Sequence, residues 1–349
     1  MDIKHIRDAH TPSRATRAAL TLGVTAALVL PMAASAVAVG ATAAAPANTA
    51  TSAAARVNTR DAYVAIVKQG NRRHLRVVSR STGKVLRHVA TATKTDEFIE
   101  PFADADLAAD GSVWAVVADT KLPEYYQSRL VRYVGSRAER SLPYVTSVRL
   151  SPDEKRMAIT VLSPDGDGDG YGLSALRLAN LRGKVTSTLA TTKLPVDRKQ
   201  GYPLIETGSL TVRGWMGAND LVVTTGCCDE GSVSIVSTLK PTRQQTWPTF
   251  TGTGDTTALG VKGSNLLVAT SRVVEVKGSP HTFTRAGIDA FWMTKRKPAG
   301  TLFTHIRGSN LAVADHTDSL VKKAGATPLE ISTKRFPYKG TGSVLRALL

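Results

Sequence analysis

The feature that most constrains this chain is an internal repeat of a turn followed by an apolar strand. Five segments share this form: "AADGSVWAVVAD", "SPDEKRMAITV", "GANDLVVTTG", "KGSNLLVATS" and "RGSNLAVADH". Their turn residues, Asp110, Asp153, Ala218, Gly263 and Gly308, are 43, 65, 45 and 45 positions apart. A period of about 45 residues is that of a propeller blade, a four-stranded unit that must stack on its neighbours because it cannot cover its own apolar faces.

A second recurring element supports the same architecture. The segments "LRVVSRSTGKVLRHV", "RLVRYVGSRAERSL" and "LRLANLRGKVTSTL" each read as a strand, a turn glycine and another strand. The long interval between two repeats contains "SPDGDGDGYG" and "KLPVDRKQGYPLIE", which we interpret as insertions. Because short β-type runs dominate and helical periodicity is scarce, we expect an all-β fold. Strands near residues 62, 113, 157, 220, 265 and 310 predict a β-propeller of about six four-stranded blades, and five to seven blades fit the spacing.

One repeat resembles a known family. The segment "SPDEKRMAI", residues 151–159, is similar to the S-P-D-G-K-x-[IL]-A strand signature of Tol-type and WD-repeat-like β-propellers of secreted and periplasmic bacterial proteins. The likeness is weaker for "AADGSVWAV" and formal in the other repeats, and Glu154 stands where the family usually has glycine. The resemblance implies a ring of blades with ligands bound at the central channel or the loop face. It does not select a function, because such propellers include binding modules and enzymes.

The N-terminal residues indicate export. Basic residues at Lys4, Arg7, Arg14 and Arg17 precede the uncharged, mostly apolar run 18–40. Small-residue exits of the A-x-A type follow at 34–36 and 45–47, as in a secretory signal peptide. We therefore expect a signal over residues 1–47, a linker over 48–60 and a single propeller domain over 61–349, located outside the cell or in the cell envelope. An uncleaved anchor is the alternative, since the run has about the 20 residues that a membrane span needs.

Charge is distributed unevenly along the chain. The formal net charge is +17, with 45 Lys and Arg against 28 Asp and Glu. Residues 61–92 carry +6, residues 94–124 carry −6 and residues 271–349 carry +8. A closed ring would bring the two basic segments together as a basic sector, whose predicted binding residues are Arg72, Arg73, Arg76, Arg80, Lys84, Arg87, Lys295, Arg296 and Lys297. The partners expected for such a sector are an anionic envelope polymer, an acidic protein or a membrane surface. Nucleic acid is disfavoured, because no basic motif is interleaved with aromatic residues.

An acidic loop is the one metal candidate. Asp165, Asp167 and Asp169 occupy the first, third and fifth positions of a D-x-D-x-D-G calcium loop. The ninth and twelfth positions are Leu173 and Leu176, where an EF-hand loop would complete its ligand set. Two interpretations stay open, a calcium site and a solvated acidic turn. No other cofactor is predicted.

The two cysteines, Cys227 and Cys228, are adjacent in "TTGCCDEG". Adjacent Cα atoms lie about 3.8 Å apart, closer than a usual disulfide allows. A strained vicinal disulfide and a pair of thiols, free or bonded to another molecule, both remain open.

Catalytic motifs do not decide the function. The chain has no G-x-S-x-G, H-E-x-x-H or Walker-type segment, and its histidines lack metal-ligand spacing. We therefore predict no catalytic residue and expect a monomeric, non-catalytic binding or scaffold propeller. The alternative is a hydrolase or lyase acting on envelope polysaccharide or peptide, which three or more carboxylates or histidines converging on the central pocket would favour.

Overall fold

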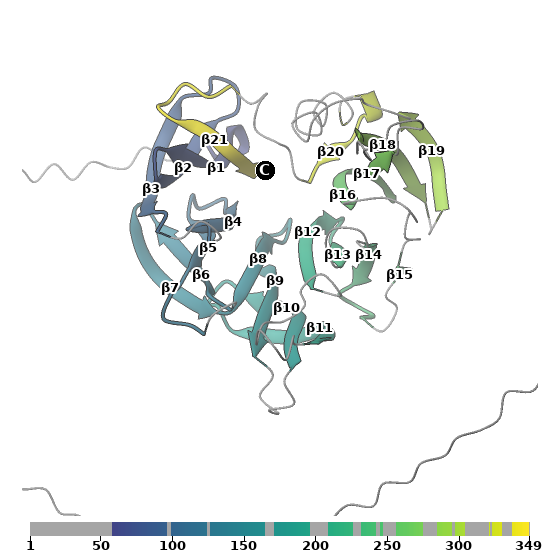
Figure 1. Cartoon of the computed structure of the whole chain (residues 1–349), viewed down its shortest axis with the longest axis horizontal. Coiled ribbons are helices and arrows are strands. Elements are labelled where there is room, and N and C mark those ends of the chain that lie inside the picture. The colour runs from purple at the N-terminus through teal and green to yellow at the C-terminus, as the bar shows by residue number, and fades with distance from the viewer. Residues whose placement is uncertain are drawn as a thin grey trace, which may run out of the picture. The chain divides into compact units, whose positions relative to one another are not determined.

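The prediction of an all-β propeller of four-stranded blades is confirmed. The computed structural model describes residues 58–95, 99–123, 126–164, 171–195, 209–225, 232–241, 245–246, 256–274, 285–294, 297–303, 321, 323–329 and 337–348. Their strands form five antiparallel sheets, which belong to one compact unit, Ala54–Leu349. Figure 1 shows these sheets arranged as blades around a common axis.

Blade 1 combines strands from both ends of the chain. Its order from the inside outward is β21 (Ser343–Leu348), β1 (Ala62–Gln69), β2 (Arg72–Ser79) and β3 (Val85–Thr93). Strand β21 pairs antiparallel with β1, from Val64 opposite Leu348 to Lys68 opposite Ser343. The C-terminal strand is thus part of the first blade, which places basic residues of the two chain ends in one sheet.

The other four blades follow one another along the chain. Blade 2 is β4 (Phe102–Leu107), β5 (Val113–Ala118), β6 (Ser128–Val134) and β7 (Arg137–Pro143). Blade 3 is β8 (Val145–Leu150), β9 (Arg156–Pro164), β10 (Tyr171–Asn180) and β11 (Val185–Pro195). Blade 4 is β12 (Leu210–Met216), β13 (Asp220–Thr225), β14 (Ser232–Ser237) and β15 (Gln245–Thr246). Blade 5 is β16 (Thr256–Lys262), β17 (Asn265–Val274), β18 (Arg285–Thr294) and β19 (Lys297–Phe303), with β20 (Thr327–Pro328) paired to β16.

Five of the six strand positions expected from the repeat fall on the second strand of a blade. Positions 62, 113, 157, 220 and 265 lie in β1, β5, β9, β13 and β17. The sixth, near residue 310, lies outside the described residues. The described residues therefore form five blades, one fewer than the best fit to the spacing and within the range that the spacing allowed.

The same turn geometry recurs in blades 2 to 5. In blades 2, 4 and 5 the turn between the first two strands contains Gly111, Gly217 or Gly263, with φ of 81°, 70° and 57°. In blade 3 the corresponding residue is Glu154, with φ of 51°. Left-handed backbone favours glycine because it has no Cβ. The glutamate thus departs from the pattern of the other repeats at the same backbone conformation.

The core lies between blades. One cluster packs Val64 and Leu75 of blade 1 against Phe102 and Val113 of blade 2. Similar clusters join blades 2 and 3, blades 3 and 4, and blades 4 and 5. Full burial of one such side chain contributes about 1.5–3 kcal/mol. Each blade is therefore stabilised mainly by its neighbours, as the repeat required.

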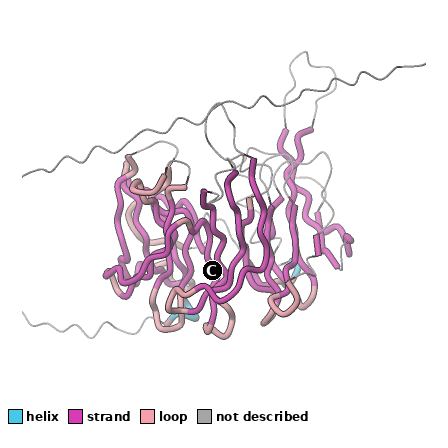
Figure 2. The backbone as a smooth tube through the Cα atoms, turned by 90° about the horizontal axis from the view of Figure 1, so that it is seen from below, coloured by secondary structure: helices cyan, strands magenta, loops and turns pink. Residues whose placement is uncertain are grey.

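Short turns gather at one end of the ring, as Figure 2 shows. We call this the turn end; it carries the β2–β3, β4–β5, β6–β7, β8–β9, β10–β11, β12–β13, β14–β15 and β16–β17 turns. Contacts join neighbouring turns, since Arg87 donates to the carbonyl of Gly111 and Arg156 donates to that of Ala218 at 3.1 Å. Among the described residues, no helix has the length and hydropathy of a membrane span.

Candidate functional site: the central cavity and the turn end

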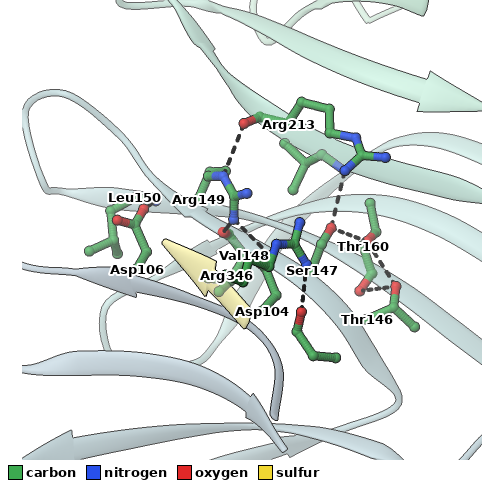
Figure 3. A network of polar contacts seen from close by, with 12 residues as sticks. Asp104, Asp106, Thr146, Ser147, Val148, Arg149, Leu150, Thr160, Arg213 and Arg346 are labelled. Carbon is green, nitrogen blue, oxygen red and sulfur yellow. Dashed lines mark hydrogen bonds and ion pairs between the residues drawn. The ribbon is translucent and has the colours of Figure 1, made fainter. Parts of the chain in front are cut away.

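Side-chain oxygen atoms join the innermost strands of neighbouring blades (Figure 3). Carboxylates of β4 accept hydrogen bonds from β8, and a hydroxyl of β8 accepts one from β12. The contacts are Val148 N to Asp104 Oδ2 at 3.0 Å, Leu150 N to Asp106 Oδ2 at 2.7 Å, and Val212 N to Ser147 Oγ at 3.1 Å. An edge strand has backbone N–H groups that its own sheet cannot pair. These side chains satisfy them and fix each blade against the next.

A buried ion pair lies beside these contacts. Arg149 Nη1 is 2.7 Å from Asp104 Oδ2, and both side chains are almost inaccessible to solvent, with relative exposures of 7% and 3%. Arg149 also donates from Nε to the carbonyl of Arg213 at 3.0 Å, and its own carbonyl accepts from Trp215 Nε1 at 3.2 Å. One guanidinium thereby connects the inner strands of blades 2, 3 and 4.

The second carboxylate of β4 is held differently. Asp106 accepts from the backbone N–H groups of Leu107 at 2.8 Å and Leu150 at 2.7 Å. Burial raises its pKa to about 6, because the charged form is desolvated. The positive charge of Arg149 and the two hydrogen bonds oppose this rise, and the nearby Asp104 adds to it. Asp106 can therefore exchange a proton close to neutral pH.

These groups border a cavity of about 250 Å³. Its wall is formed by the innermost strands of blades 2 to 5, by β20 and by the β8–β9 turn, so it reaches the turn end. Charged lining residues of both signs meet there, namely Asp106, Glu154, Arg149 and Arg213, and Trp215 adds an aromatic surface. The described lining thus offers donors, acceptors and apolar contacts together.

Glu154 reaches this cavity from its strained turn. Its Oε2 accepts a hydrogen bond from the backbone N–H of Ala109 in the β4–β5 turn at 2.7 Å. A left-handed conformation costs a residue with a side chain roughly 1–2 kcal/mol. The contact between blades 2 and 3 offsets part of that cost, and the carboxylate is placed at the cavity wall.

Exposed basic side chains are numerous at the turn end. They are Arg80, Lys84, Arg137, Lys155, Arg182, Lys184, Lys240, Lys262 and Lys339. The acidic residues of the same turns are engaged locally: Asp110 pairs with Arg132 at 2.7 Å, and Asp153 accepts from Ser151 at 2.6 Å. Among the described residues, none of the lysines in this set forms an ion pair. Their charges are therefore available to a partner.

Two members of the predicted basic sector are not surface residues. Arg73 is 4% exposed and forms a bidentate pair with Glu100, with Nε to Oε2 at 2.7 Å and Nη2 to Oε1 at 3.1 Å. Arg76 is 3% exposed and donates to the hydroxyl of Tyr338 and to the carbonyl of Thr341, at 2.8 Å from the latter. The expectation that these two arginines present exposed charge is wrong, because both faces of β2 are covered.

The remaining predicted binding residues divide into two groups. Arg72, Arg80 and Lys84 are exposed, and Arg87 is half-buried. Arg80 and Lys84 lie at the turn end, whereas Arg72 begins β2 at the opposite end. The described residues exclude Lys295 and Arg296, and Lys297 is described only as the first residue of β19.

Three other predicted features lie outside the described residues. They are the acidic loop with Asp165, Asp167 and Asp169, the cysteine pair Cys227 and Cys228, and the predicted signal.

The residues at the centre of the ring are not evident from the sequence. Asp104 and Asp106 belong to an acidic segment, and no motif distinguishes Arg149. A signal was present in "FADADL", where two aspartates alternate with alanine inside a strand. Acidic residues are rare on a buried strand face unless they are paired.

Comparisons with known proteins do not identify a function. No protein-family model matches the chain, and no curated protein is significantly similar to it. Among solved structures, the β-propeller domain of the Trilobed protease from Pyrococcus furiosus is 15% identical with a TM-score of 0.37, over 59% of this chain and 58% of that one. A putative 6-phosphogluconolactonase from Bacteroides uniformis is 11% identical with a TM-score of 0.40, over 72% and 70%. The acylaminoacyl peptidase of Pyrococcus horikoshii is 10% identical with a TM-score of 0.34, over 68% and 39%.

This chain thus spans less than two thirds of the Pyrococcus furiosus chain that it resembles. At such identities and TM-scores the likeness carries no conclusion about function.

Proposed function

We propose that this protein is an exported binding module of the cell envelope, and that its turn end contacts an anionic polymer or the acidic surface of a protein. The observation that carries the proposal is the set of exposed basic residues on turns of all five blades, with the acidic residues of those turns engaged in local contacts. A face of net positive charge attracts an oppositely charged partner over about a Debye length, ~8 Å at physiological ionic strength. The proposed binding surface is thus the turn end of the ring and not the single basic sector expected from the sequence.

Export is part of the proposed function. We infer that the N-terminal signal is removed, so that sequencing the mature protein should show a start between residues 37 and 48. Full-length protein recovered from the membrane fraction would instead support an anchor. We expect the protein to bind this partner as a monomer.

Charge reversal at the turn end should weaken binding to dextran sulfate and to poly-glutamate. The variant Lys84→Glu, Lys155→Glu, Lys184→Glu should bind at least about tenfold more weakly at low salt and lose part of its salt dependence, because fewer counterions are released. Folding should change little, since exposed charges contribute roughly 0–1 kcal/mol each. Affinity is measured by titration calorimetry at 50 and 500 mM salt.

A control with the same change in net charge separates location from overall charge. Lys68→Glu, Arg72→Glu, Lys121→Glu alters three exposed residues at the opposite end of the ring. It should retain most of the affinity. Equal losses in the two triple variants would mean that only the total charge matters, and the turn end would lose its assigned role.

The acidic loop gives a separate prediction. If Asp165, Asp167 and Asp169 hold calcium, then 5 mM calcium should raise the melting temperature, because a ligand of the folded state stabilises it by mass action. Asp167→Asn should abolish the rise. Coincident melting curves in calcium and in chelator would identify an ordinary acidic turn.

One observation supports a second function, a hydrolase or lyase of envelope polysaccharide or peptide. The described cavity lining holds two carboxylates, Asp106 and Glu154, fewer than the three that would favour an enzyme, but burial raises the pKa of Asp106 to about 6 beside Arg149. A carboxyl group that titrates near the working pH is suited to general acid or base chemistry. Envelope polysaccharide and peptide fragments incubated with the protein should then be cleaved, and Asp106→Asn should stop the reaction. Intact fragments with the wild-type protein would leave the binding function alone.

A further inference from the structure

A separate cavity of about 420 Å³ lies between blades 2 and 3. One wall is the connection between these blades, residues 142–145, which comprises the end of β7, Tyr144 and the start of β8. The other wall is formed by β9, β10 and β11 of blade 3. We call this cavity the blade 2–3 groove. It shares no described lining residue with the central cavity.

The strand register places the blade 3 residues of the groove on one face of the sheet. Ile159 on β9 is opposite Arg177 on β10, and Val161 lies two residues further along β9. Val185 on β11 is opposite Ala179, which is two residues from Arg177. Ile159, Val161 and Ala179 belong to the core cluster between blades 2 and 3, so this face is directed toward blade 2.

Apolar side chains remain accessible at the margins of the groove. Val185 is 38% exposed, and Leu142 and Tyr144 are half-buried. Ile159 and Val161 are buried and close the bottom. A ligand in the groove would therefore contact the marginal side chains and remove their apolar surface from water, which is favourable.

Tyr144 stands in this wall with an unusual backbone conformation. Its φ of 64° lies in the left-handed region, which disfavours residues that have a Cβ. Two backbone hydrogen bonds hold it: its N–H donates to the carbonyl of Ser128 at 2.7 Å, and its carbonyl accepts from the N–H of Leu162 at 2.8 Å. The fold thus fixes this wall before a ligand binds, which lowers the entropy cost of binding.

Arg177 supplies the charge of the groove. Of the described lining residues it alone is charged, and it is half-buried. Its Nε is buried without a hydrogen-bond partner, and among the described residues no carboxylate forms an ion pair with it. A guanidinium is a permanent cation in proteins. The fold therefore leaves one positive charge unneutralised beside an apolar surface.

We infer that the blade 2–3 groove binds an aliphatic carboxylate, such as a medium-chain fatty acid. The carboxylate would pair with the guanidinium of Arg177, whose planar fork of donors matches two oxygens. The alkyl chain would cover the accessible surfaces of Leu142, Tyr144 and Val185. Pockets of roughly 300–1,000 Å³ with an apolar lining and a few polar groups are typical of small-molecule sites. The inference does not rest on the proposed function, because Arg177 is not one of the exposed basic residues of the turn end.

The test is titration of the full chain with hexanoate, octanoate and decanoate, by calorimetry for affinity and by amide chemical shifts for location. Octanoate should bind, with the largest shifts at residues 142–145 and 175–179. Each added methylene should tighten binding about fourfold while the groove has room for it, because burial of a methylene group is favourable.

Two pairs of variants separate the charge from the apolar wall. Octanoate should bind at least about tenfold more tightly than 1-octanol, and Arg177→Met should abolish that preference. Arg182→Met, which removes an exposed arginine from the β10–β11 turn, should retain it. Val185→Asp places a carboxylate on the same face as Arg177 and should weaken octanoate binding at least about tenfold. Val134→Asp, at a 43% exposed position outside the described lining, should not.

Three results would overturn the inference. These are no binding of any of the three carboxylates, binding with shifts confined to other blades, and a preference for octanoate over 1-octanol that persists in Arg177→Met. Dextran sulfate should bind Arg177→Met as well as it binds the wild type. Failure of this site and failure of the turn-end proposal are thus distinguishable.

Discussion

Replacing Arg149 by methionine is expected to lower the free energy of unfolding by about 3–5 kcal/mol, because the variant leaves the carboxylate of Asp104 buried without its partner. The same change removes a hydrogen bond to the carbonyl of Arg213 in the next blade. Urea denaturation at pH 7, with tryptophan fluorescence as the readout, measures the loss. A loss below 1 kcal/mol would show that this ion pair does not hold the centre of the ring.

Two controls sharpen this prediction. Arg132→Met removes a pair of the same 2.7 Å length with Asp110, whose side chain is 57% exposed, and a 3.3 Å pair with Glu139, and should cost no more than about 2 kcal/mol. The double variant Asp104→Leu, Arg149→Met replaces both buried charges with apolar groups and should be more stable than Arg149→Met alone. Additive losses in the double-mutant cycle would mean that the two side chains do not interact.

The second large effect is a pH-dependent gain of stability in Asp106→Asn. Because burial raises the pKa of Asp106 in the folded protein to about 6, above the 3.8 of an unperturbed aspartate, folding favours the protonated form. The stability contributed by proton uptake is complete below about pH 4 and is lost as the pH rises through 6. The wild type should therefore lose up to about 3 kcal/mol between pH 4 and pH 7 relative to the neutral amide, at 1.36 kcal/mol for each pKa unit.

Unfolding free energies of the two proteins at pH 4.5, 5.5, 6.5 and 7.5 test this difference. Asp153→Asn is the matched control, and its difference from wild type should stay constant over this pH range, because hydrogen bonding by Ser151 lowers the pKa of Asp153 below 3.8. The stability contributed by that carboxylate is present above its unfolded pKa and is lost as the pH falls. A difference between wild type and Asp106→Asn that is constant with pH would refute the assignment of a raised pKa.

The sequence predicted the blades well because each repeat is encoded locally. A turn residue with left-handed backbone and an apolar strand after it suffice to place β5, β9, β13 and β17. Strand β21 could not be placed in the same way. It has no repeat turn of its own, and its place beside β1 depends on a pairing of residues nearly 280 positions apart.

Net charge per sequence segment was the poorest guide to which side chains lie on the surface. Arg73 and Arg76 look like surface residues in "RRHLRVVS", yet Glu100 and Tyr338, far away in the sequence, cover them. Net charge per segment cannot distinguish a buried, paired arginine from an exposed one. For the same reason, segment charge could not reveal the roles of Asp104 and Asp106, which accept hydrogen bonds from backbone N–H groups of the next blade.

We expect the turn end to be the surface that contacts an anionic partner. Hydrogen–deuterium exchange of the full chain with and without dextran sulfate locates the contact directly. Exchange should become slower in residues 80–84, 151–155 and 181–184, on the turns of blades 1 and 3 that carry exposed lysines. Protection confined to the opposite end of the ring, around residues 68–72 and 119–123, would contradict it.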